Sequence, residues 1–447
     1  MISGKRRAVC ALAAAALFGA GGCAGTTMPA HNGTPPQELA PAVQRYPIKH
    51  VVVVIQENRT FDNFFAGFPG ADAPTTGRTH DGRTIRLKPI TFARVTLDHF
   101  YKAGKTAYNN GAMNGFDLIP FQPPFTKYTP YSRVERSLVK PYWDMAQQYV
   151  LADHMFPTEW GPSFTAHLNL VAGTTTVARG ESVVDMPMLD GRVVAGGCDA
   201  PAGTVTSLIT VDGRYLDQGG PFPCYSFPTL ADVLDAGHVS WKWYGANWPG
   251  GKSLWNAFEA IRKVRYGPDW SRHIVNTNKQ VLVDAAAGKL PAVSWVIPTM
   301  PDSDHPGAGK PYGPSWVSAV VNAIGTGPDW KSSAIVIVWD DWGGWYDNVA
   351  PPQLDYRGLG ARVGCIVISP YAKAGYVDHT QYEFGSILRT IERIYGLPRI
   401  GTTDRRANVM FGAFDFSQTP RPFKVIQARY PARFFMDEPP SNLDLDD

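Results

Sequence analysis

Long apolar runs, excess charge and repeats are all scarce in this chain of 447 residues, and each shortage excludes a class of protein. Beyond residue 20 no apolar stretch is long enough to span a membrane. The formal net charge is only +3, and Lys5, Arg6 and Arg7 near the start account for it, so the remainder is close to neutral. The absence of a basic stripe argues against nucleic-acid binding. The absence of a fixed-period repeat argues against a solenoid.

Cysteine is also rare, with five residues in the chain. Cys10 and Cys23 belong to a leader-like N-terminus. Cys198 and Cys224 lie in polar loops rich in Gly and Pro, and we expect them to be bonded to each other in an oxidising compartment. Cys365 lies in an apolar, strand-like segment and is interpreted as a small core residue and not a nucleophile.

The first 23 residues have the pattern of an export signal. A basic stretch precedes an apolar run, and small residues then lead to Cys23, which is typical of a secretory leader with a lipoprotein-type processing site. Ordinary cleavage near Ala24 or Ala30 is the alternative. The sequence thus predicts an exported protein, either periplasmic, secreted or attached to a membrane through lipidated Cys23. Residues 24–46, rich in Pro, Gly and Thr, are expected to form a flexible tether.

Strand-like and helix-like segments alternate along the rest of the chain, which favours an α/β fold with a mostly parallel central sheet and helices on both faces. Apolar residues make up 44% of the sequence, enough for a large core. Two segments rich in Gly, Pro and Tyr (66–135 and 174–226) are interpreted as loop-rich insertions that shape a pocket. The predicted strands are 49–56, 239–244, 292–297, 334–339 and 363–369, and the predicted helices are 163–172, 228–236, 316–324 and 382–395.

Two acidic clusters each follow a short β-branched run. Glu57 and Asn58 follow one run, and Asp340 and Asp341 follow the other. Such runs are typical of buried parallel strands, and ligands of open α/β sheets bind beyond the carboxyl ends of the strands. We therefore expect these four side chains to converge. Three carboxylates and an amide form an oxygen-rich cage suited to a divalent cation.

A nucleophile candidate lies in the segment Gly161-Pro162-Ser163, at the start of a predicted helix. One interpretation is that Ser163 merely caps the helix, which is common. The other is that the helix N-terminus attracts an anion and a nearby metal activates the Ser163 hydroxyl for attack on phosphorus.

These motifs, in this order, resemble the bacterial phosphoesterases that include phosphatidylcholine-type phospholipases C and acid phosphatases, within the alkaline-phosphatase-like fold group. The resemblance covers residues 47–425, interpreted as the catalytic domain, and leaves 426–447 as a C-terminal tail. It rests on Glu57-Asn58-Arg59-Thr60-Phe61-Asp62, Gly161-Pro162-Ser163, Ser303-Asp304-His305-Pro306, the segment from Trp339 to Asp347, and the strand and turn from Arg362 to Tyr371.

The resemblance implies a metal held by Glu57, Asn58, Asp340 and Asp341, with the Ser163 oxygen also at the metal. It further implies catalytic histidines around the phosphoryl group, first His305, then His99, and with less support His167. One divalent ion is expected; oxygen ligands favour Ca²⁺, Mg²⁺ or Mn²⁺, with Zn²⁺ as an alternative.

Three positions depart from the family pattern. Asp341 stands where many members have Glu, Ala166 replaces an Asn, and Asn348 replaces a His. These changes affect the expected leaving-group preference and leave the basic chemistry intact.

The resulting hypothesis is an exported, metal-dependent phosphoesterase that hydrolyses phosphate mono- or diesters through a phosphoserine at Ser163. The substrate is a phosphate ester, either a phospholipid head group or a soluble monoester. The alternative is a non-catalytic surface lipoprotein that binds phosphorylated ligands. Aromatic residues fit a choline-binding pocket or, as we favour, the core: Trp160, Phe164, Trp241, Tyr244, Trp342, Trp345 and Tyr346.

Overall fold

The structure, a computed structural model, describes residues 46–95, 97–245 and 253–439. The predicted leader with Cys23, nearly all of the predicted tether and residues 440–447 of the predicted tail lie outside the described residues, so export and lipidation stay predictions. Within the described part of the chain, no helix combines the length and apolar character needed to cross a membrane.

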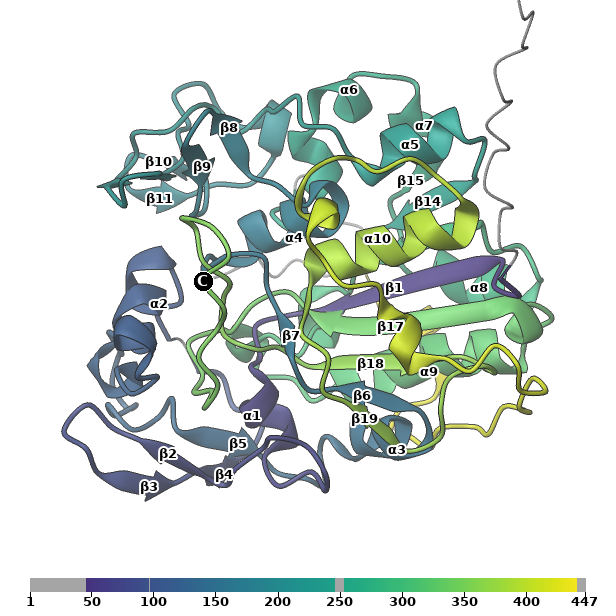
Figure 1. The fold of residues 1–447 in the computed structure, drawn as a ribbon, viewed down its shortest axis with the longest axis horizontal. Coiled ribbons are helices and arrows are strands. Elements are labelled where there is room, and N and C mark those ends of the chain that lie inside the picture. The colour runs from purple at the N-terminus through teal and green to yellow at the C-terminus, as the bar shows by residue number, and fades with distance from the viewer. Residues whose placement is uncertain (1–45, 96, 246–252, 440–447) are drawn as a thin grey trace, which may run out of the picture. The chain divides into compact units, whose positions relative to one another are not determined.

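An eight-stranded sheet in the order β15-β14-β16-β1-β17-β18-β6-β19 forms the centre of the described chain (Figure 1). Every strand runs parallel to its neighbours except β18, which is antiparallel to β17 and β6. The predicted mostly parallel sheet is therefore confirmed. Its strands are β1 (His50–Gln56), β6 (Val150–Ala152), β14 (Trp241–Tyr244), β15 (Ile274–Val275), β16 (Val293–Val296), β17 (Ser333–Trp339), β18 (Cys365–Ile368) and β19 (Tyr376–Asp378).

Helices cover both faces of this sheet, as predicted. On one face, Trp295 of β16 donates from Nε1 to the Leu170 carbonyl of α4 (Ser163–Ala172), 3.3 Å away. Trp243 of β14 pairs with Trp295 and therefore points to the same face. Neighbouring residues of a strand point to opposite faces, so Tyr244 points to the other face. There its hydroxyl donates to Asp284 of α8 (Gln280–Ala286) at 2.7 Å. The first face also carries α10 (Phe384–Tyr395), which packs on α4, and the second carries α9 (Gly313–Thr326), which packs on α8. The remaining helices are α1 (Phe61–Phe65), α2 (Tyr101–Tyr108), α3 (Lys140–Gln148), α5 (Leu230–Ala236), α6 (Arg262–Arg265), α7 (Asp269–His273) and α11 (Ala432–Asp437).

The predicted elements match the observed ones within a few residues. The helix predicted over 163–172 has those bounds. The helix predicted over 316–324 extends further in both directions, from Gly313 to Thr326. Its early start follows from Pro314, because a proline in the first helical turn loses no hydrogen bond.

The two predicted insertions contain short strands and many turns. In residues 66–135, strands β2 and β3 pair, as do β4 and β5. In residues 174–226, one small sheet has the order β13-β12-β9-β8 and another joins β10 to β11. The strands of the insertions are β2 (Thr76–Arg78), β3 (Thr84–Arg86), β4 (Lys88–Ile90), β5 (Ser132–Val134), β8 (Thr176–Ala178), β9 (Glu181–Val183), β10 (Met188–Leu189), β11 (Arg192–Val193), β12 (Leu208–Thr210) and β13 (Tyr215–Leu216). Outside the insertions, β7 (Met155–Phe156) pairs with β20 (Tyr382–Glu383).

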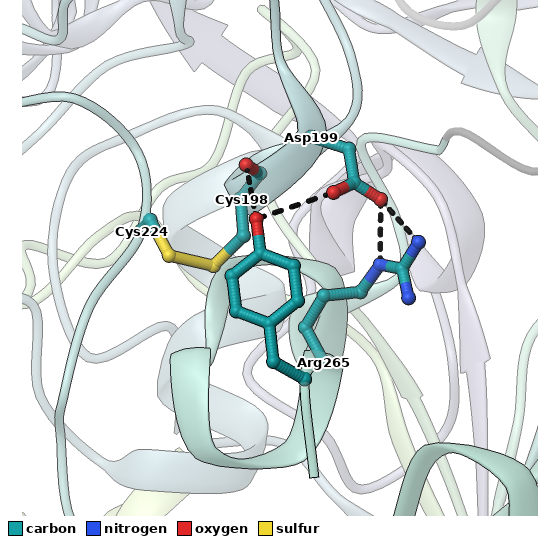
Figure 2. Close-up of a disulfide and its surroundings, with 5 residues drawn as sticks. Cys198, Asp199, Cys224 and Arg265 are labelled. Atoms are coloured by element: carbon teal, nitrogen blue, oxygen red, sulfur yellow. Dashed lines mark hydrogen bonds and ion pairs between the residues drawn. A yellow bond between two sulfur atoms is a disulfide. The ribbon is translucent and has the colours of Figure 1, made fainter.

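A disulfide between Cys198 and Cys224 closes the second insertion (Figure 2). Beside it, Asp199 accepts a hydrogen bond from Arg265 Nε at 2.7 Å, and the Tyr266 hydroxyl donates to the Cys198 carbonyl at 2.8 Å. The insertion is therefore tied to the end of α6. Cys365 is free and buried in β18, so the predicted pairing and the predicted core cysteine are both confirmed.

Part of the predicted tail packs against the domain. Phe435 of α11 is 1% exposed, and its ring centroid lies 5.5 Å from that of Trp316 on α9. Ile426 is also buried and donates from its backbone to Asn322 Oδ1 at 2.8 Å. The predicted boundary at residue 425 stays a prediction.

Candidate active site

The two acidic motifs meet because their strands are neighbours in register. Strand β1 pairs in parallel with β17, with Gln56 opposite Trp339, so both chains leave the sheet at the same edge. The Asn58 and Asp341 amides then donate to the same oxygen, Asp340 Oδ1, at 2.8 and 2.6 Å. These hydrogen bonds fix the Asp340 carboxylate.

Glycine at position 343 is required by this close approach. A Cβ atom there would lie 2.1 Å from the Asn58 carbonyl oxygen, and Gly343 has a φ of +55°. Its amide donates to Asp341 Oδ1 at 2.7 Å. The Gly343-Gly344 pair of the second motif therefore lets its backbone fold against the first motif while it orients Asp341.

Ser163 lies at this junction. Its Oγ is 3.1 Å from Asp341 Oδ2 and 3.3 Å from Asn58 Oδ1. Pro162, not Ser163, occupies the N-cap position of α4, so the capping interpretation does not account for this serine. The hydroxyl instead faces the acidic motifs at the positive end of the helix dipole, where an anion is favoured.

His167 lies one turn along α4 and on the same side as Ser163, as expected for residues four apart. Its Nε2 is 3.0 Å from Glu57 Oε1 and 3.7 Å from Asp340 Oδ2, and all three side chains are fully buried. One ligand atom from each of the three lies within 4.8 Å of the others. His167 is predicted as a catalytic histidine, whereas its contacts group it with the expected metal ligands.

We call Glu57, Asn58, Ser163, His167, Asp340 and Asp341 the serine cluster. It contains all five predicted metal ligands. All six residues are buried. Three carboxylates in one buried site are costly unless a cation compensates them. The donor set of carboxylates, an amide, a hydroxyl and an imidazole therefore fits a divalent ion, and the imidazole adds a ligand type that suits Zn²⁺ to the oxygens that suit Mg²⁺, Ca²⁺ and Mn²⁺.

His99 contacts the serine cluster through Asn58. Its Nδ1 is 3.0 Å from the Leu97 carbonyl, which requires a proton on Nδ1, and its Nε2 then accepts from Asn58 Nδ2 at 3.1 Å. With Nδ2 bonded to His99, the side-chain oxygen Oδ1 of Asn58 faces Ser163. The contacts therefore fit a positioning role for His99, because donating a proton from Nε2 would require breaking the bond to Asn58.

His305 lies in the loop after β16 and approaches the cluster by way of Trp255. The Trp255 ring stacks on His167 with centroids 6.4 Å apart, and its centroid is 6.1 Å from that of His305. The Gly307 amide donates to His305 Nδ1 at 3.0 Å. A neutral His305 therefore carries its proton on Nε2.

The residue before His305 is part of a buried network. Arg59 donates from Nε to the Asp304 carbonyl at 2.8 Å, and Tyr142 donates to Asp304 Oδ2 at 2.6 Å. Burial raises the pKa of Asp304 to about 7, although the Tyr142 hydrogen bond and the Arg59 charge act in the opposite direction. This network joins the first acidic motif to the histidine loop.

A second buried ion network joins Arg362, Asp347 and Asp62, for which the motifs predicted no role. Arg362 donates from Nε to Asp347 Oδ1 at 2.8 Å and lies 3.5 Å from Asp62 Oδ1. Burial, and next the charge of Asp347, hold the pKa of Asp62 well above its ordinary value, despite the opposing charge of Arg362. These three residues end or begin three of the five motifs, so the signal was present in the motifs themselves. They hold the motifs together without contacting Ser163 in the described hydrogen bonds.

The aromatic residues considered for choline binding are buried, each at most 4% exposed. All seven belong to the two hydrophobic clusters of the described residues. Their arrangement is that of core residues, as favoured from the sequence.

Two bacterial phospholipases C are similar to this chain in sequence. The hemolytic phospholipase C of Pseudomonas aeruginosa is 23% identical over 416 residues, which cover 78% of this chain and 53% of that protein. Phospholipase C A of Mycobacterium tuberculosis is 26% identical over 448 residues, covering 83% of this chain and 78% of that protein. The chain thus spans about half the length of the Pseudomonas relative.

Among solved structures, a protein in the alkaline phosphatase superfamily from Vibrio parahaemolyticus aligns with a TM-score of 0.39 at 10% identity, over 83% of this chain and 73% of that chain. Residues 48–398 match the Phosphoesterase family. This match covers most of the chain and contains the whole serine cluster. The protein therefore belongs to the Phosphoesterase family.

Proposed function

We propose that this protein is a metal-dependent phosphoesterase that acts through a covalent phosphoserine at Ser163. The observation that carries the proposal is the position of Ser163 Oγ, 3.1 Å from Asp341 Oδ2, at the start of α4 and inside a buried set of carboxylates. A hydroxyl in this setting has a base beside it and the positive end of a helix dipole facing the site.

Residues that would hold the ion are Glu57, Asn58, His167, Asp340 and Asp341, together with the Ser163 oxygen. When bound, a divalent ion neutralises phosphoryl oxygens and lowers the pKa of a coordinated hydroxyl. The fixed carboxylates that would hold such an ion agree with a phosphoryl-transfer site, in which positioning and charge stabilisation supply most of the catalysis.

The residues of the chain account for the remaining steps. Asp341 Oδ2 accepts the Ser163 proton as Oγ attacks phosphorus in line. The bond from phosphorus to the leaving oxygen breaks, and the alcohol departs with a proton taken up from solvent. The Nε2–H of His305 donates a hydrogen bond to negative charge that develops on the substrate, a preorganised donor of the kind that stabilises transition states. His99 binds Asn58 Nδ2 and so keeps the side-chain oxygen Oδ1 of Asn58 directed toward Ser163. Water then attacks the phosphoserine and the P–Oγ bond breaks. Oγ takes back the proton held by Asp341, and the proton of the attacking water passes to solvent. The product is phosphate from a monoester or a phosphomonoester from a diester.

The relatives named phospholipase C make a phospholipid phosphodiester one candidate substrate, and a soluble phosphate monoester is the other. The N-terminal leader favours action outside the cytoplasm, with attachment to a membrane through Cys23 if the lipoprotein-type site is processed. The competing function is a surface lipoprotein that binds phosphorylated ligands without turnover. It would leave unexplained why a serine hydroxyl faces Asp341 in a buried site.

One experiment separates these functions. Hydrolysis of p-nitrophenyl phosphate and p-nitrophenyl phosphorylcholine is measured with and without a chelator, for the wild type and for Ser163→Ala. We expect turnover that the chelator abolishes, and a loss of at least about 10³-fold in Ser163→Ala, since the nucleophile has no substitute. Acid quenching of the wild type during turnover should trap phosphate on Ser163, detectable by mass spectrometry.

The matched control is Ser318→Ala, which removes a buried helical hydroxyl from α9 that bonds only to the Pro314 carbonyl in the described contacts. It should turn over at the wild-type rate. Near-normal turnover in Ser163→Ala without a trapped adduct would favour attack by water instead. A wild type that binds phosphate yet hydrolyses neither compound, with metal supplied, would favour the ligand-binding function.

A further inference from the structure

Two chain connections run side by side at one edge of the central sheet. The first joins β6 to β7 through Asp153 and His154, and the second joins β19 to β20 through His379. Strand β6 pairs in parallel with β19, and β7 pairs in parallel with β20. Backbone hydrogen bonds continue between them, from the Asp153 amide to the Asp378 carbonyl at 3.2 Å and from the Tyr382 amide to the His154 carbonyl at 2.8 Å.

One buried carboxylate and two imidazoles face each other at this point. His154 Nδ1 lies 2.8 Å from Asp153 Oδ1, and His379 Nδ1 lies 2.9 Å from Asp153 Oδ2. The Asp153 side chain is fully buried, whereas the side chains of His154 and His379 are 26% and 60% exposed. One ligand atom from each residue lies within 4.8 Å of the other two. We call these three residues the edge cluster.

We propose that the edge cluster binds one divalent transition-metal ion of the Zn²⁺ type, through the Asp153 carboxylate and the Nδ1 atoms of His154 and His379. Two imidazoles and one carboxylate suit such an ion and not Ca²⁺ or Mg²⁺, which prefer oxygen ligands. The His379 side chain is 60% exposed, so the site is open to solvent.

The spacing between the carboxylate and each imidazole agrees with this proposal. Ligands about 2.0–2.1 Å from a tetrahedral Zn²⁺ lie about 3.3 Å apart. The observed carboxylate–imidazole contacts of 2.8 and 2.9 Å need to open by only a few tenths of an ångström. The Asp72 amide already donates to Asp153 Oδ2 at 2.9 Å, and it fixes the carboxylate from behind, as second-sphere partners of metal ligands do.

The edge cluster is separate from the serine cluster. Strand β18 lies between β6 and β17 in the sheet. The end of β6, next to the edge cluster, and the end of β17, next to the serine cluster, are therefore about 10 Å apart. A bound ion would join β6–β7 to β19–β20, and β7 leads directly into the segment that carries Ser163. The ion would therefore hold the start of the Ser163 segment in place against β19–β20. Hydrogen bonding alone, with both imidazoles donating to Asp153, is the competing explanation of the same contacts.

Metal counting distinguishes the two explanations. The full chain is stripped with a chelator, dialysed against Zn²⁺ alone, and its bound metal is counted by mass spectrometry, for the wild type, His379→Ala and the milder His379→Gln. The control is His80→Ala, because His80 pairs with a buried carboxylate, Asp117, at 2.6 Å, and this pair belongs to neither of the two possible metal-ligand groups among the described residues. Equal melting temperatures in chelator would verify that the variants fold.

We expect the wild type and His80→Ala to bind one more Zn²⁺ per chain than either His379 variant, or to bind that ion at least about 10-fold more tightly. Added Zn²⁺ should raise the melting temperature of the wild type further than that of His379→Ala. Equal stoichiometry and affinity in all four proteins would overturn the proposal. The same difference should persist when Asp340→Asn is present in every protein, so the result does not depend on the proposed phosphoesterase activity.

Discussion

The serine cluster and the edge cluster combine carboxylates with imidazoles at the same edge of one sheet, yet they differ in their surroundings. In the serine cluster, Glu57, His167 and Asp340 are fully buried, and a helix N-terminus presents Ser163 to them. In the edge cluster, only Asp153 is buried, and His379 is 60% exposed. In both clusters, one ligand atom from each of three residues lies within 4.8 Å of the other two.

This difference indicates which features are needed for catalysis and which only for binding an ion. Both clusters have ligands at suitable spacing. The serine cluster alone adds a hydroxyl next to a carboxylate, and burial there strengthens electrostatic interactions with a reacting phosphoryl group. We therefore assign chemistry to the serine cluster and only ion binding to the edge cluster.

Asp340→Asn tests this division with the largest expected effect. It removes a negative charge from the buried cluster while it keeps the side-chain shape, so turnover of p-nitrophenyl phosphate should fall by at least about 10³-fold. Metal counting should show loss of the ion at the serine cluster and retention of the ion at the edge cluster. Full turnover with unchanged metal content would contradict the proposed cage. Loss of both ions would show that the two clusters do not bind ions independently.

Arg362→Met tests the buried link between the two regions. Arg362 is fully buried, and besides Asp347 it donates to the Asp153 carbonyl at 2.9 Å. Its removal leaves Asp62 and Asp347 buried together without their cation, so the free energy of unfolding should fall by about 3–5 kcal/mol. Urea unfolding at neutral pH measures it.

Exposed Arg393→Met on α10 is the control for Arg362→Met and should change stability by less than about 0.5 kcal/mol. Adding Asp347→Asn to Arg362→Met should restore part of the loss, because it removes one uncompensated charge. A loss below 1 kcal/mol in Arg362→Met would mean that the network contributes little to holding the motifs together.

Much of the fold was predictable because periodicity and β-branched runs are local signals. The runs before Glu57 and Asp340 indicated buried strands, and β1 and β17 are those strands. The pairing of β7 with β20 was not predictable, since each has two residues and is held by partners distant in the chain. The antiparallel direction of β18 likewise depends on tertiary context and not on its own sequence.

The convergence of Glu57, Asn58, Asp340 and Asp341 followed from strand order and motif position. The contact of His167 with Glu57 was missed, although its spacing of four residues from Ser163 on one helix was a usable signal. The edge cluster was not predictable, because Asp153 and His379 lie 226 residues apart and neither segment carries a recognisable metal motif.

Glu259 is a buried carboxylate outside both clusters, and no imidazole is among its described hydrogen-bond partners. Glu259 accepts hydrogen bonds from the Ser253 amide at 2.8 Å and from Asn256 Nδ2 at 3.5 Å. Burial raises the pKa of Glu259 to about 8, although the hydrogen bond from Ser253 and the charge of Arg265 oppose the shift. The folded protein should therefore hold this carboxyl group protonated at neutral pH.

The sign of the pH effect follows from this raised pKa. Below pH 4.5 the group is protonated in both the folded and the unfolded chain and contributes no pH dependence. Between pH 4.5 and about 8 the unfolded chain releases the proton first, so the free energy of unfolding falls as pH rises, by at most about 1.4 kcal/mol per pH unit. Glu259→Gln cannot release a proton, and it should remove this part of the decline.

Urea unfolding of the wild type and Glu259→Gln at pH 5, 6.5 and 8 measures the difference, with Glu181→Gln on β9 as the control for exchanging Glu for Gln at a partly exposed position. We expect Glu259→Gln to gain stability relative to the wild type as pH rises, and Glu181→Gln to follow the wild type. A constant difference between Glu259→Gln and the wild type would show that Glu259 is ionised in the folded protein. Amide hydrogen bonds and the charge of Arg265 would then suffice to hold a buried carboxylate without an ion, and burial of the acidic residues in the serine cluster would be weaker support for a bound ion.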